Sequence, residues 1–444
     1  MNLSTRRINF VLIIFIFLII ATLILFYAIG YRYDFLKKEV VKVGVLYIDS
    51  SPKNAKIYLN GRDTDKETPS RIFGLLPNEY KLEIRREGYF TYQKKISVYP
   101  EIATNLRNII LFKNTYSLNE IVSENIKQIQ LSSSGQKAAY LIESNDSEGL
   151  FIYDFNSEDK KLIFEDKLSN PVNNFILSPY SDCIFVKQKN KQLIINVNND
   201  EKINLDKYKL NINDIKWDSD NEKIIYTLIN GAIYQINLIE DKVMLIVNKN
   251  IVDLTIKNRM IFYIDKQNDA LKFNYYDLNR NLSNEILDLR QSDKFDILSD
   301  SYKFIVLIDR KNEDVYLVDT STSPITYEKL NIQAKSSQFT ADHKKLLYYN
   351  DYEIGYFDFE KGENNLITRT SNQIQKAIWH PLEQNIIYLE GNKLKITELS
   401  GPVRNTFDLY QSNIIDFIID INGKNVYLYD KISENNILSK LNIR

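Results

Sequence analysis

The sequence predicts an all-β protein that carries one N-terminal transmembrane helix. Two observations predict the β structure. A unit of about 40 residues recurs eight times between Ile126 and the C-terminus, and the stretch after Gly44 alternates apolar and polar residues between Gly, Pro and Asn turns. A third observation, an apolar run near the start of the chain, predicts the helix.

The apolar run predicts a membrane anchor. Residues 10–29 are apolar except for Thr22, and at 1.5 Å per residue a helix of this length spans a hydrocarbon core of about 30 Å. We therefore expect a transmembrane helix at 9–30, in contact with the lipid bilayer. A cleaved signal peptide is the alternative, because Ala28-Ile29-Gly30 has the small-x-small pattern of a cleavage site. Signal peptides have shorter apolar regions, of about 7–15 residues, which favours the anchor.

Charged residues around the run predict the topology. Arg6 and Arg7 precede the run, and basic residues favour the cytoplasmic side of a membrane. Basic residues also follow the run, in the segment 31–42, which we interpret as a juxtamembrane linker. Because a very short N-terminal tail usually stays inside, we expect residues 1–8 in the cytoplasm and the C-terminal domains outside it. This is the topology of a single-pass protein of the cell membrane.

Residues 43–113 predict a small β domain. Short alternating strands such as Val45–Ile48 and Lys56–Leu59 are bounded by turn residues, and this pattern is typical of an antiparallel sandwich with one buried face per sheet. Asn60-Gly61 is a strong hairpin signal, because both residues tolerate positive φ.

Five short motifs in this stretch resemble the PEGA domain. In order they are Ser51-Pro52 with Ala55, Asn60-Gly61, Thr68-Pro69, Leu76 with Tyr80, and Gly88-Tyr89. Two glycines usual in the family are replaced by Asn54 and Asn78, and Asn is the next-best residue at positive φ. PEGA domains are extracytoplasmic modules of bacterial and archaeal envelope proteins, so the resemblance implies an envelope location. Because the matching residues are turn formers, we expect them to be structural.

The repeats at 114–444 predict a β-propeller. Each unit has two apolar strands, a third strand that often ends in an acidic residue such as Asp319, and a fourth short apolar run. Four short strands per unit form the blade of a propeller. The last unit has only three strands, and the spare strand at 116–122 can complete it and remove the open edges. This predicts eight blades, with seven as the alternative if the weak unit at 251–289 is irregular.

The turns between the first two strands resemble those of TolB-like and WD40-like propellers, whose pattern runs Trp-Ser-Pro-Asp-Gly-Lys before Ile-Ala-Tyr. Matching copies include Leu177-Ser-Pro179, Trp217-Asp-Ser-Asp220 and Trp379-His-Pro381. The Gly-His and Trp-Asp marks of WD40 repeats are absent, so TolB-like is the closer comparison. Trp217 and Trp379 occupy equivalent positions, which predicts that they pack in the core and do not form a ligand platform.

The sequence offers little of the chemistry that enzymes need. His343 and His380 fall in equivalent turns of two units, and no Cys or carboxylate cluster accompanies them at the spacing of metal ligands. The single cysteine, Cys183, is expected to be a buried strand residue. No Gly-x-Ser-x-Gly nucleophile motif and no Gly-rich phosphate loop occurs. We therefore predict no catalytic, cofactor-binding or metal-binding residues and no cofactor, and we interpret the acidic residues that end third strands as turn formers.

These observations predict a non-catalytic function. The net charge of −1 does not suggest nucleic-acid binding. We expect a membrane-anchored, extracytoplasmic binding or scaffold protein of the cell envelope, whose propeller recognises a protein or a glycan through its loops. One alternative is an envelope glycan lyase or hydrolase at the propeller mouth, which three or more ionisable side chains converging on one pocket would favour. The other is a sensor that signals through a partner helix.

Overall fold

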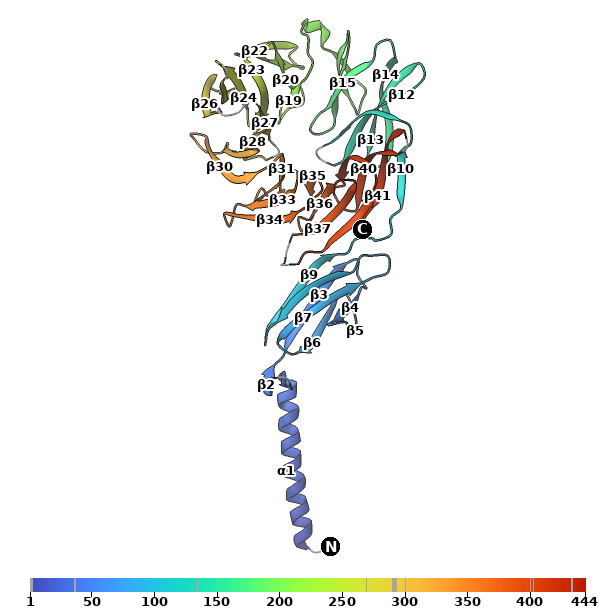
Figure 1. Cartoon of the computed structure of the whole chain (residues 1–444), viewed down its shortest axis with the longest axis vertical. Helices are drawn as coiled ribbons and strands as arrows, with labels where there is room; N and C mark the ends of the chain where they lie inside the picture. Colours follow the sequence, from blue (N-terminus) through green and yellow to red (C-terminus); the bar gives the residue numbers. More distant parts are fainter. Residues whose placement is uncertain are drawn as a thin grey trace. The chain divides into compact units, whose positions relative to one another are not determined.

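The computed structural model describes residues 3–35, 37–132, 135–268, 270–289, 294–299, 301–399, 401, 403–432 and 434–444, with side chains described from Phe10 onwards. The chain divides into two compact units (Figure 1). Unit 1 comprises Met1–Tyr116 with Gly401–Phe407 and Ile443–Arg444, and unit 2 comprises Ser117–Ser400 with Asp408–Asn442.

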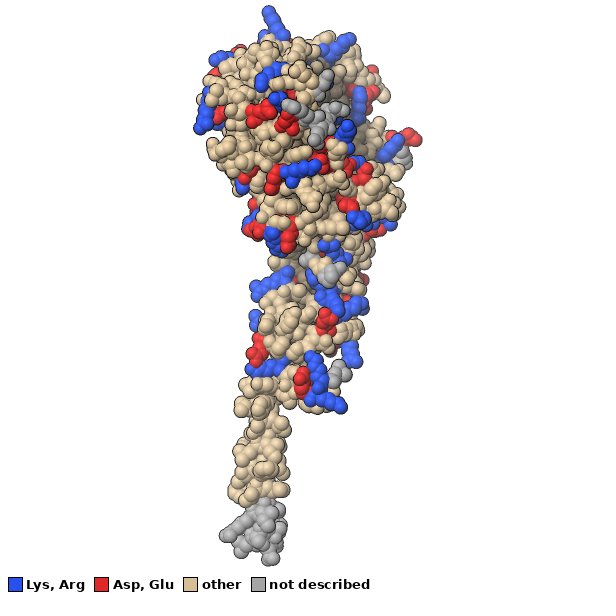
Figure 2. All heavy atoms as spheres, turned by 60° about the vertical axis from the view of Figure 1, so that its left-hand side comes forward, with Lys and Arg blue, Asp and Glu red and all other residues tan. Residues whose placement is uncertain are grey.

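Unit 1 begins with the helix α1, Leu3–Ala28. Its side chains from Phe10 onwards are exposed, and the part from Phe10 to Ala28 is long and apolar enough to cross a membrane. Figure 2 shows no Lys, Arg, Asp or Glu on this part of the helix. The predicted apolar helix is therefore present, and its properties suit both a single-pass anchor and a signal sequence.

A hairpin follows the helix where the sequence suggested only a linker. β1, Tyr31–Asp34, pairs antiparallel with β2, Glu39–Lys42. Lys38 in the connecting turn adopts a left-handed φ of 55°. This hairpin is difficult to predict because two four-residue strands show too little alternation to stand out from a charged linker.

The sandwich of unit 1 has two sheets that share one core. A three-stranded sheet has the order β6-β3-β9 and a four-stranded sheet has the order β5-β4-β7-β8. Their bounds are β3 Gly44–Ser51, β4 Lys56–Leu59, β5 Arg62–Glu67, β6 Ser70–Leu75, β7 Asn78–Arg85, β8 Tyr92–Val98 and β9 Ala103–Ile110. Leu46 and Ile48 of β3 pack with Ile57 of β4 and Ile84 of β7 in this core. The expectation of a fully antiparallel sandwich is wrong, because β3 pairs with β9 in parallel; alternation predicts which face is buried but not strand direction.

The turn residues of the sandwich have structural roles. The Thr68 hydroxyl lies 2.6 Å from the Ser50 hydroxyl and accepts a hydrogen bond from the Ala55 N–H at 3.1 Å. Asn60 and Gly61 both have positive φ, as the hairpin signal predicts. Asn54 also has positive φ, at 59°, so it does take the place of a turn glycine.

Unit 2 consists, across the described residues, of eight four-stranded sheets (Figure 1). Seven of them use four consecutive strands each. The first four of these are β11 Ile126–Leu131, β12 Lys137–Glu143, β13 Ser147–Asp154 and β14 Asp159–Lys167; β15 Val172–Leu177, β16 Cys183–Gln188, β17 Gln192–Asn196 and β18 Lys202–Asn204; β19 Lys216–Trp217, β20 Ile224–Ile229, β21 Ala232–Asn237 and β22 Lys242–Asn248; β23 Ile251–Lys257, β24 Met260–Gln267, β25 Ala270–Asp277 and β26 Leu282–Asp288. The next three are β27 Phe295–Leu298, β28 Phe304–Asp309, β29 Asp314–Asp319 and β30 Thr326–Gln333; β31 Ser336–Phe339, β32 Lys345–Tyr349, β33 Glu353–Asp358 and β34 Glu363–Arg369; β35 Ile374–Trp379, β36 Asn385–Glu390, β37 Lys393–Glu398 and β38 Thr406–Gln411.

The remaining sheet joins the two ends of the repeat region. Its order is β10-β41-β40-β39, with β10 Leu118–Val122, β39 Ile414–Ile419, β40 Asn425–Ile432 and β41 Asn435–Asn442. Glu120 of β10 is paired with Ser439 of β41. The predicted completion of the last unit by the strand before the first unit is therefore confirmed, and it covers the edge that β41 would otherwise expose.

The unit at 251–289, suspected of irregularity, forms a regular sheet. Its shorter turn is a two-residue hairpin in which Asn258 and Arg259 both have positive φ, as type I′ turns require. The irregular strand is instead β19, with only two residues, which follows the 3₁₀ turn Asp206–Tyr208.

Both tryptophans pack between neighbouring sheets, as predicted. Trp379 lies in a core with Leu347 and Ile354 of the preceding sheet, and only 6% of it is exposed. Trp217 lies in the equivalent core with Phe185 of its own preceding sheet. Bulky side chains at this repeat position therefore hold adjacent sheets together.

Candidate functional site

The candidate site is a cavity of about 750 Å³ in unit 2. Its lining comes mainly from the first strands of four consecutive sheets, β11, β15, β19 and β23, together with Ser299 just after β27. Each first strand lies at an edge of its sheet, and the first strands of a propeller surround its central channel. We call this cavity the channel cavity.

Neutral polar side chains contribute much of the lining. Gln128 of β11 and Asn174 of β15 are half-buried, and no hydrogen bond links their side-chain amides to another described residue. By contrast, Gln130 accepts a hydrogen bond from the Leu177 N–H at 2.9 Å through its Oε1. Gln130 therefore joins two sheets, whereas Gln128 and Asn174 keep both amide donors and acceptors available to a ligand.

Three ionisable side chains meet beside the channel cavity. Asp214, Lys216 and Asp253 line an adjoining hollow of about 180 Å³, and Asp214 and Lys216 also line the channel cavity. Among the described side chains, none forms an ion pair with these three. The Ile215 N–H donates to Asp214 Oδ1 at 2.9 Å, and the Leu254 N–H donates to Asp253 Oδ1 at 2.8 Å.

Burial determines the electrostatics of Asp253. Loss of contact with water raises the pKa of its carboxyl above the ordinary value, and the negative charge of Asp214 adds to the rise. The positive charge of Lys216 and the hydrogen bond from the Leu254 N–H oppose it without cancelling it. Asp253 is thus a carboxyl group whose charge is incompletely compensated within the chain.

Charged groups on the first strands of other sheets are paired. Lys376 of β35 lies 2.6 Å from Asp416 of β39 and also donates to the Phe417 carbonyl at 2.9 Å. Asp296 of β27 forms an ion pair with Arg310. The uncompensated charges therefore concentrate at β19 and β23.

The histidines have structural surroundings. His380 is fully buried; its Nδ1 accepts from the Leu382 N–H at 3.2 Å, which leaves Nε2 to donate to the Gly423 carbonyl at 3.1 Å. His343 packs edge-on against Tyr302, with ring centroids 4.4 Å apart. The two histidines do not meet, and the described part of the chain contains no group of three or more His, Cys, Asp or Glu side chains suited to a metal ion.

Cys183 is buried in β16, as expected. Burial raises the pKa of its thiol to about 11, so the reactive thiolate form is scarce at neutral pH.

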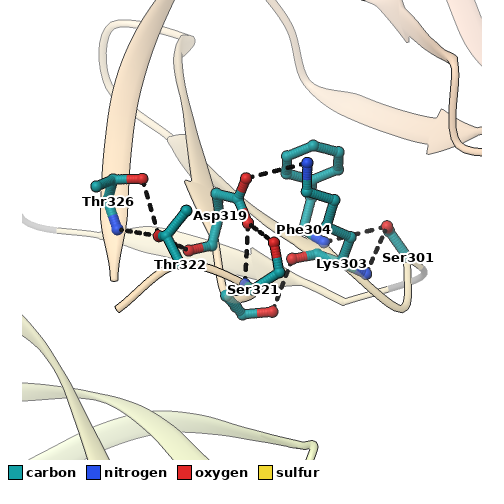
Figure 3. A network of polar contacts seen from close by, with 8 residues as sticks. Ser301, Lys303, Phe304, Asp319, Ser321, Thr322 and Thr326 are labelled. Carbon is teal, nitrogen blue, oxygen red and sulfur yellow. Dashed lines mark hydrogen bonds and ion pairs between the residues drawn. The ribbon is translucent and has the colours of Figure 1, made fainter. Parts of the chain in front are cut away.

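The acidic residues that end third strands form turns, as the sequence predicted. Figure 3 shows the example of Asp319. Its Oδ1 accepts hydrogen bonds from the Ser321 N–H at 2.9 Å and the Ser321 hydroxyl at 2.6 Å, while Lys303 Nζ lies 3.1 Å from Oδ2. Asp154 and Asp358 accept N–H groups two and three residues ahead in the same way. Because these carboxylates accept hydrogen bonds within their own turns, we do not regard them as candidate catalytic or ligand-binding groups.

The channel residues do not stand out in the sequence of any single unit. Asp214 and Asp253 both stand three positions before the bulky residue at or next to the end of the first strand, namely Trp217 and Ile256. Polar residues recur at this position in other units, including Gln128, Asn174, Lys376 and Asp416. Aligning the units on the bulky residue would therefore have revealed a position that is polar in most units.

The fold and this channel define a β-propeller protein, and comparison with known proteins adds its second module. Residues 43–110 match the PEGA domain, so the sandwich of unit 1 is a PEGA domain. No curated protein matches the chain.

Solved structures resemble the propeller. The crystal structure of the eukaryotic initiation factor matches with a TM-score of 0.52 and 12% identity, covering 72% of this chain and 86% of that one. The Dos1 propeller matches with a TM-score of 0.51 and 11% identity, covering 73% and 94%. The C-terminal WD40 domain of Sif2 matches with a TM-score of 0.49 and 14% identity, covering 74% and 98%. At identities this low, the two matches with TM-scores above 0.5 show the fold alone.

Proposed function

We propose that this protein is a membrane-anchored, extracytoplasmic binding or scaffold protein of the cell envelope, whose propeller recognises a protein or a glycan. The observation that carries the proposal is the channel cavity of about 750 Å³. Its free amide groups at Gln128 and Asn174 can both donate and accept hydrogen bonds, which suits the backbone of a peptide loop and the hydroxyls of a glycan equally.

The anchor and its orientation belong to the same proposal. The exposed apolar surface of α1 supports insertion into a bilayer, and a PEGA domain next to it suits the outer side of the membrane. Protease added to intact spheroplasts is expected to digest the propeller. Full protection of the propeller would reverse the orientation, and a mature N-terminus at Tyr31 would reveal a cleaved signal peptide.

Capture of the partner tests the channel. The full-length protein, solubilised from membranes in detergent, is expected to retain a partner that the double variant Gln128→Ala, Asn174→Ala loses. Asn279→Ala is the matched control, since Asn279 is an exposed amide in the turn between β25 and β26. If the double variant and the control retain the same partner equally, the channel is not the binding site.

A glycan-cleaving activity is the second candidate, and one observation favours it. Asp214, Lys216 and Asp253 converge on one hollow, and a carboxyl with a raised pKa beside a second carboxyl is the pairing that glycoside hydrolysis uses. Incubation with isolated envelope glycans distinguishes the two functions. If the native protein releases new reducing ends and Asp253→Asn does not, the protein is a glycan-cleaving enzyme. If the glycans stay intact, the binding function stands.

A further inference from the structure

The start of the PEGA domain contacts the end of α1 directly. The Val43 N–H donates to the Gly30 carbonyl at 3.0 Å, so the chain returns to the helix end just before β3 begins. Arg32 donates to the Tyr27 carbonyl at 2.7 Å, and its guanidinium lies 3.3 Å from the centroid of the Tyr27 ring. Hydrogen bonds therefore hold the start of the sandwich against the end of the helix.

The turn between β8 and β9 packs against the start of β3, next to the end of α1. The Val45 N–H donates to the Ile102 carbonyl at 3.4 Å, and the Glu101 N–H donates to the Val43 carbonyl at 3.3 Å. A Cβ added to Gly44 would lie 2.4 Å from the Tyr99 carbonyl oxygen, so the β8–β9 turn packs tightly on the start of β3. The β1–β2 hairpin and the β8–β9 turn thus flank the point where the helix ends.

These two segments expose apolar side chains. In the hairpin Phe35 is 82% exposed and Val40 is 60% exposed, and in the turn Tyr99 is 56% exposed and Ile102 is 57% exposed. Tyr33 adds a further exposed ring, packed edge-on against Phe35. Aromatic rings next to a transmembrane span favour the headgroup layer of the bilayer, where one side of the ring is apolar and the other is wet.

The charge of the domain has the sign that anionic lipid attracts. Residues 31–113 contain 16 Lys and Arg against 10 Asp and Glu, whereas residues 114–444 contain 39 against 48. Figure 2 shows more blue than red over the sandwich. Lys37 and Lys38 are exposed at the hairpin tip, and basic residues near a surface of anionic lipid each strengthen binding by about fivefold.

We propose that the β1–β2 hairpin and the β8–β9 turn form a docking surface for the headgroup layer of a bilayer that contains anionic phospholipid. The surface is continuous with α1 and rests on the proposed function, since it requires α1 to span the membrane. Insertion of Phe35 and Tyr99 beside the helix restrains the PEGA domain at the membrane and limits its swing about the anchor.

Tryptophan scanning of the full-length protein in lipid nanodiscs tests this surface. The native tryptophans, Trp217 and Trp379, are buried and supply a constant background of fluorescence. Phe35→Trp and Tyr99→Trp are expected to lose emission when part of the lipid carries bromine on the upper acyl chain. The matched control is Glu87→Trp, an exposed residue in the turn between β7 and β8, at the opposite end of the sandwich; its emission should not change.

A fourth variant separates this proposal from the anchor. Tyr27→Trp, in the last turn of α1, reports whether the helix is embedded. Quenching at Tyr27→Trp with none at Phe35→Trp and Tyr99→Trp would overturn the docking surface and leave the anchor intact. No quenching at any of the three would overturn both. Quenching of Phe35→Trp should also increase when phosphatidylglycerol is included in nanodiscs of phosphatidylcholine, and equal quenching would overturn the role of the lysines.

Discussion

Replacing Trp379 tests how the sheets of the propeller are held together. Its ring packs between two sheets, and its indole N–H donates to the Gln338 carbonyl at 2.9 Å. Trp379→Ala removes the ring from a site that is almost fully enclosed, which is expected to cost about 3–5 kcal/mol. Loss of the hydrogen bond leaves the part-buried Gln338 backbone carbonyl without this donor and adds to the cost.

Trp217 provides an internal control, because it fills the equivalent position but its indole N–H has no hydrogen-bond partner among the described residues. Trp379→Phe loses both volume and a hydrogen bond, whereas Trp217→Phe loses volume and removes an unsatisfied donor. We therefore expect Trp379→Phe to cost about 1–2 kcal/mol more than Trp217→Phe.

Urea unfolding of the propeller, followed by circular dichroism, measures these free energies. Binding of any captured partner by the folded fraction of Trp379→Ala should stay unchanged, since the ring is buried away from the surface. An unaltered unfolding midpoint for Trp379→Ala would refute the packing of the ring. Equal costs for the two Phe variants would refute the contribution of the Trp379 hydrogen bond.

Ring closure by β10, the burial of Asp253 and the packing at Gly423 each lead to a measurable outcome. A chain that begins at Ile126 lacks β10 and should aggregate through the exposed edge of β41, whereas one that begins at Lys113 should stay monomeric; equal behaviour in sedimentation would contradict ring closure. Asp253→Asn should stabilise the fold at pH 7. A carboxyl with a raised pKa favours folding below its unfolded pKa of about 3.9 and loses that contribution as pH rises through its folded pKa. In thermal melts the gain in melting temperature should vanish near pH 4, and a gain independent of pH would point to another cause. In urea unfolding, Gly423→Ala should cost about 1–3 kcal/mol more than Gly362→Ala. Both glycines have positive φ, but only at Gly423 would a Cβ lie 2.5 Å from the His380 ring. Equal costs would show that the ring can move aside.

Most of the fold could be predicted because its signals are local and repeated. Alternation locates the strands of the sandwich, and the recurring bulky residue that includes Trp217 and Trp379 indicates the inter-sheet core. Strand direction escaped prediction, since the parallel pairing of β3 with β9 depends on where the chain returns and not on the residues within either strand. The irregular strand β19 was also missed, because its apolar pattern is among the clearest in the chain.

The candidate site was harder to predict because it depends on register between units. Each first strand contributes a few side chains to the channel, and these groups lie about 40 residues apart in sequence. Asp214 and Asp253 therefore look like isolated turn acids until the sheets place them on one hollow. The acids that end third strands look the same in sequence, and hydrogen bonds to their own turns distinguish them, as at Asp319.

The uneven distribution of charge around the channel indicates where the proposed partner would bind. On β35 and β39, Lys376 and Asp416 satisfy each other, so a ligand gains little by approaching them. At β19 and β23, Asp214, Lys216 and Asp253 have no ion-pair partner among the described residues, and burial already disfavours the charged form of Asp253. Ligand groups that complete their hydrogen bonds there would offset a cost that the free protein carries. Recognition is therefore expected to centre on β19 and β23, with the amides of Gln128 and Asn174 extending it across the cavity.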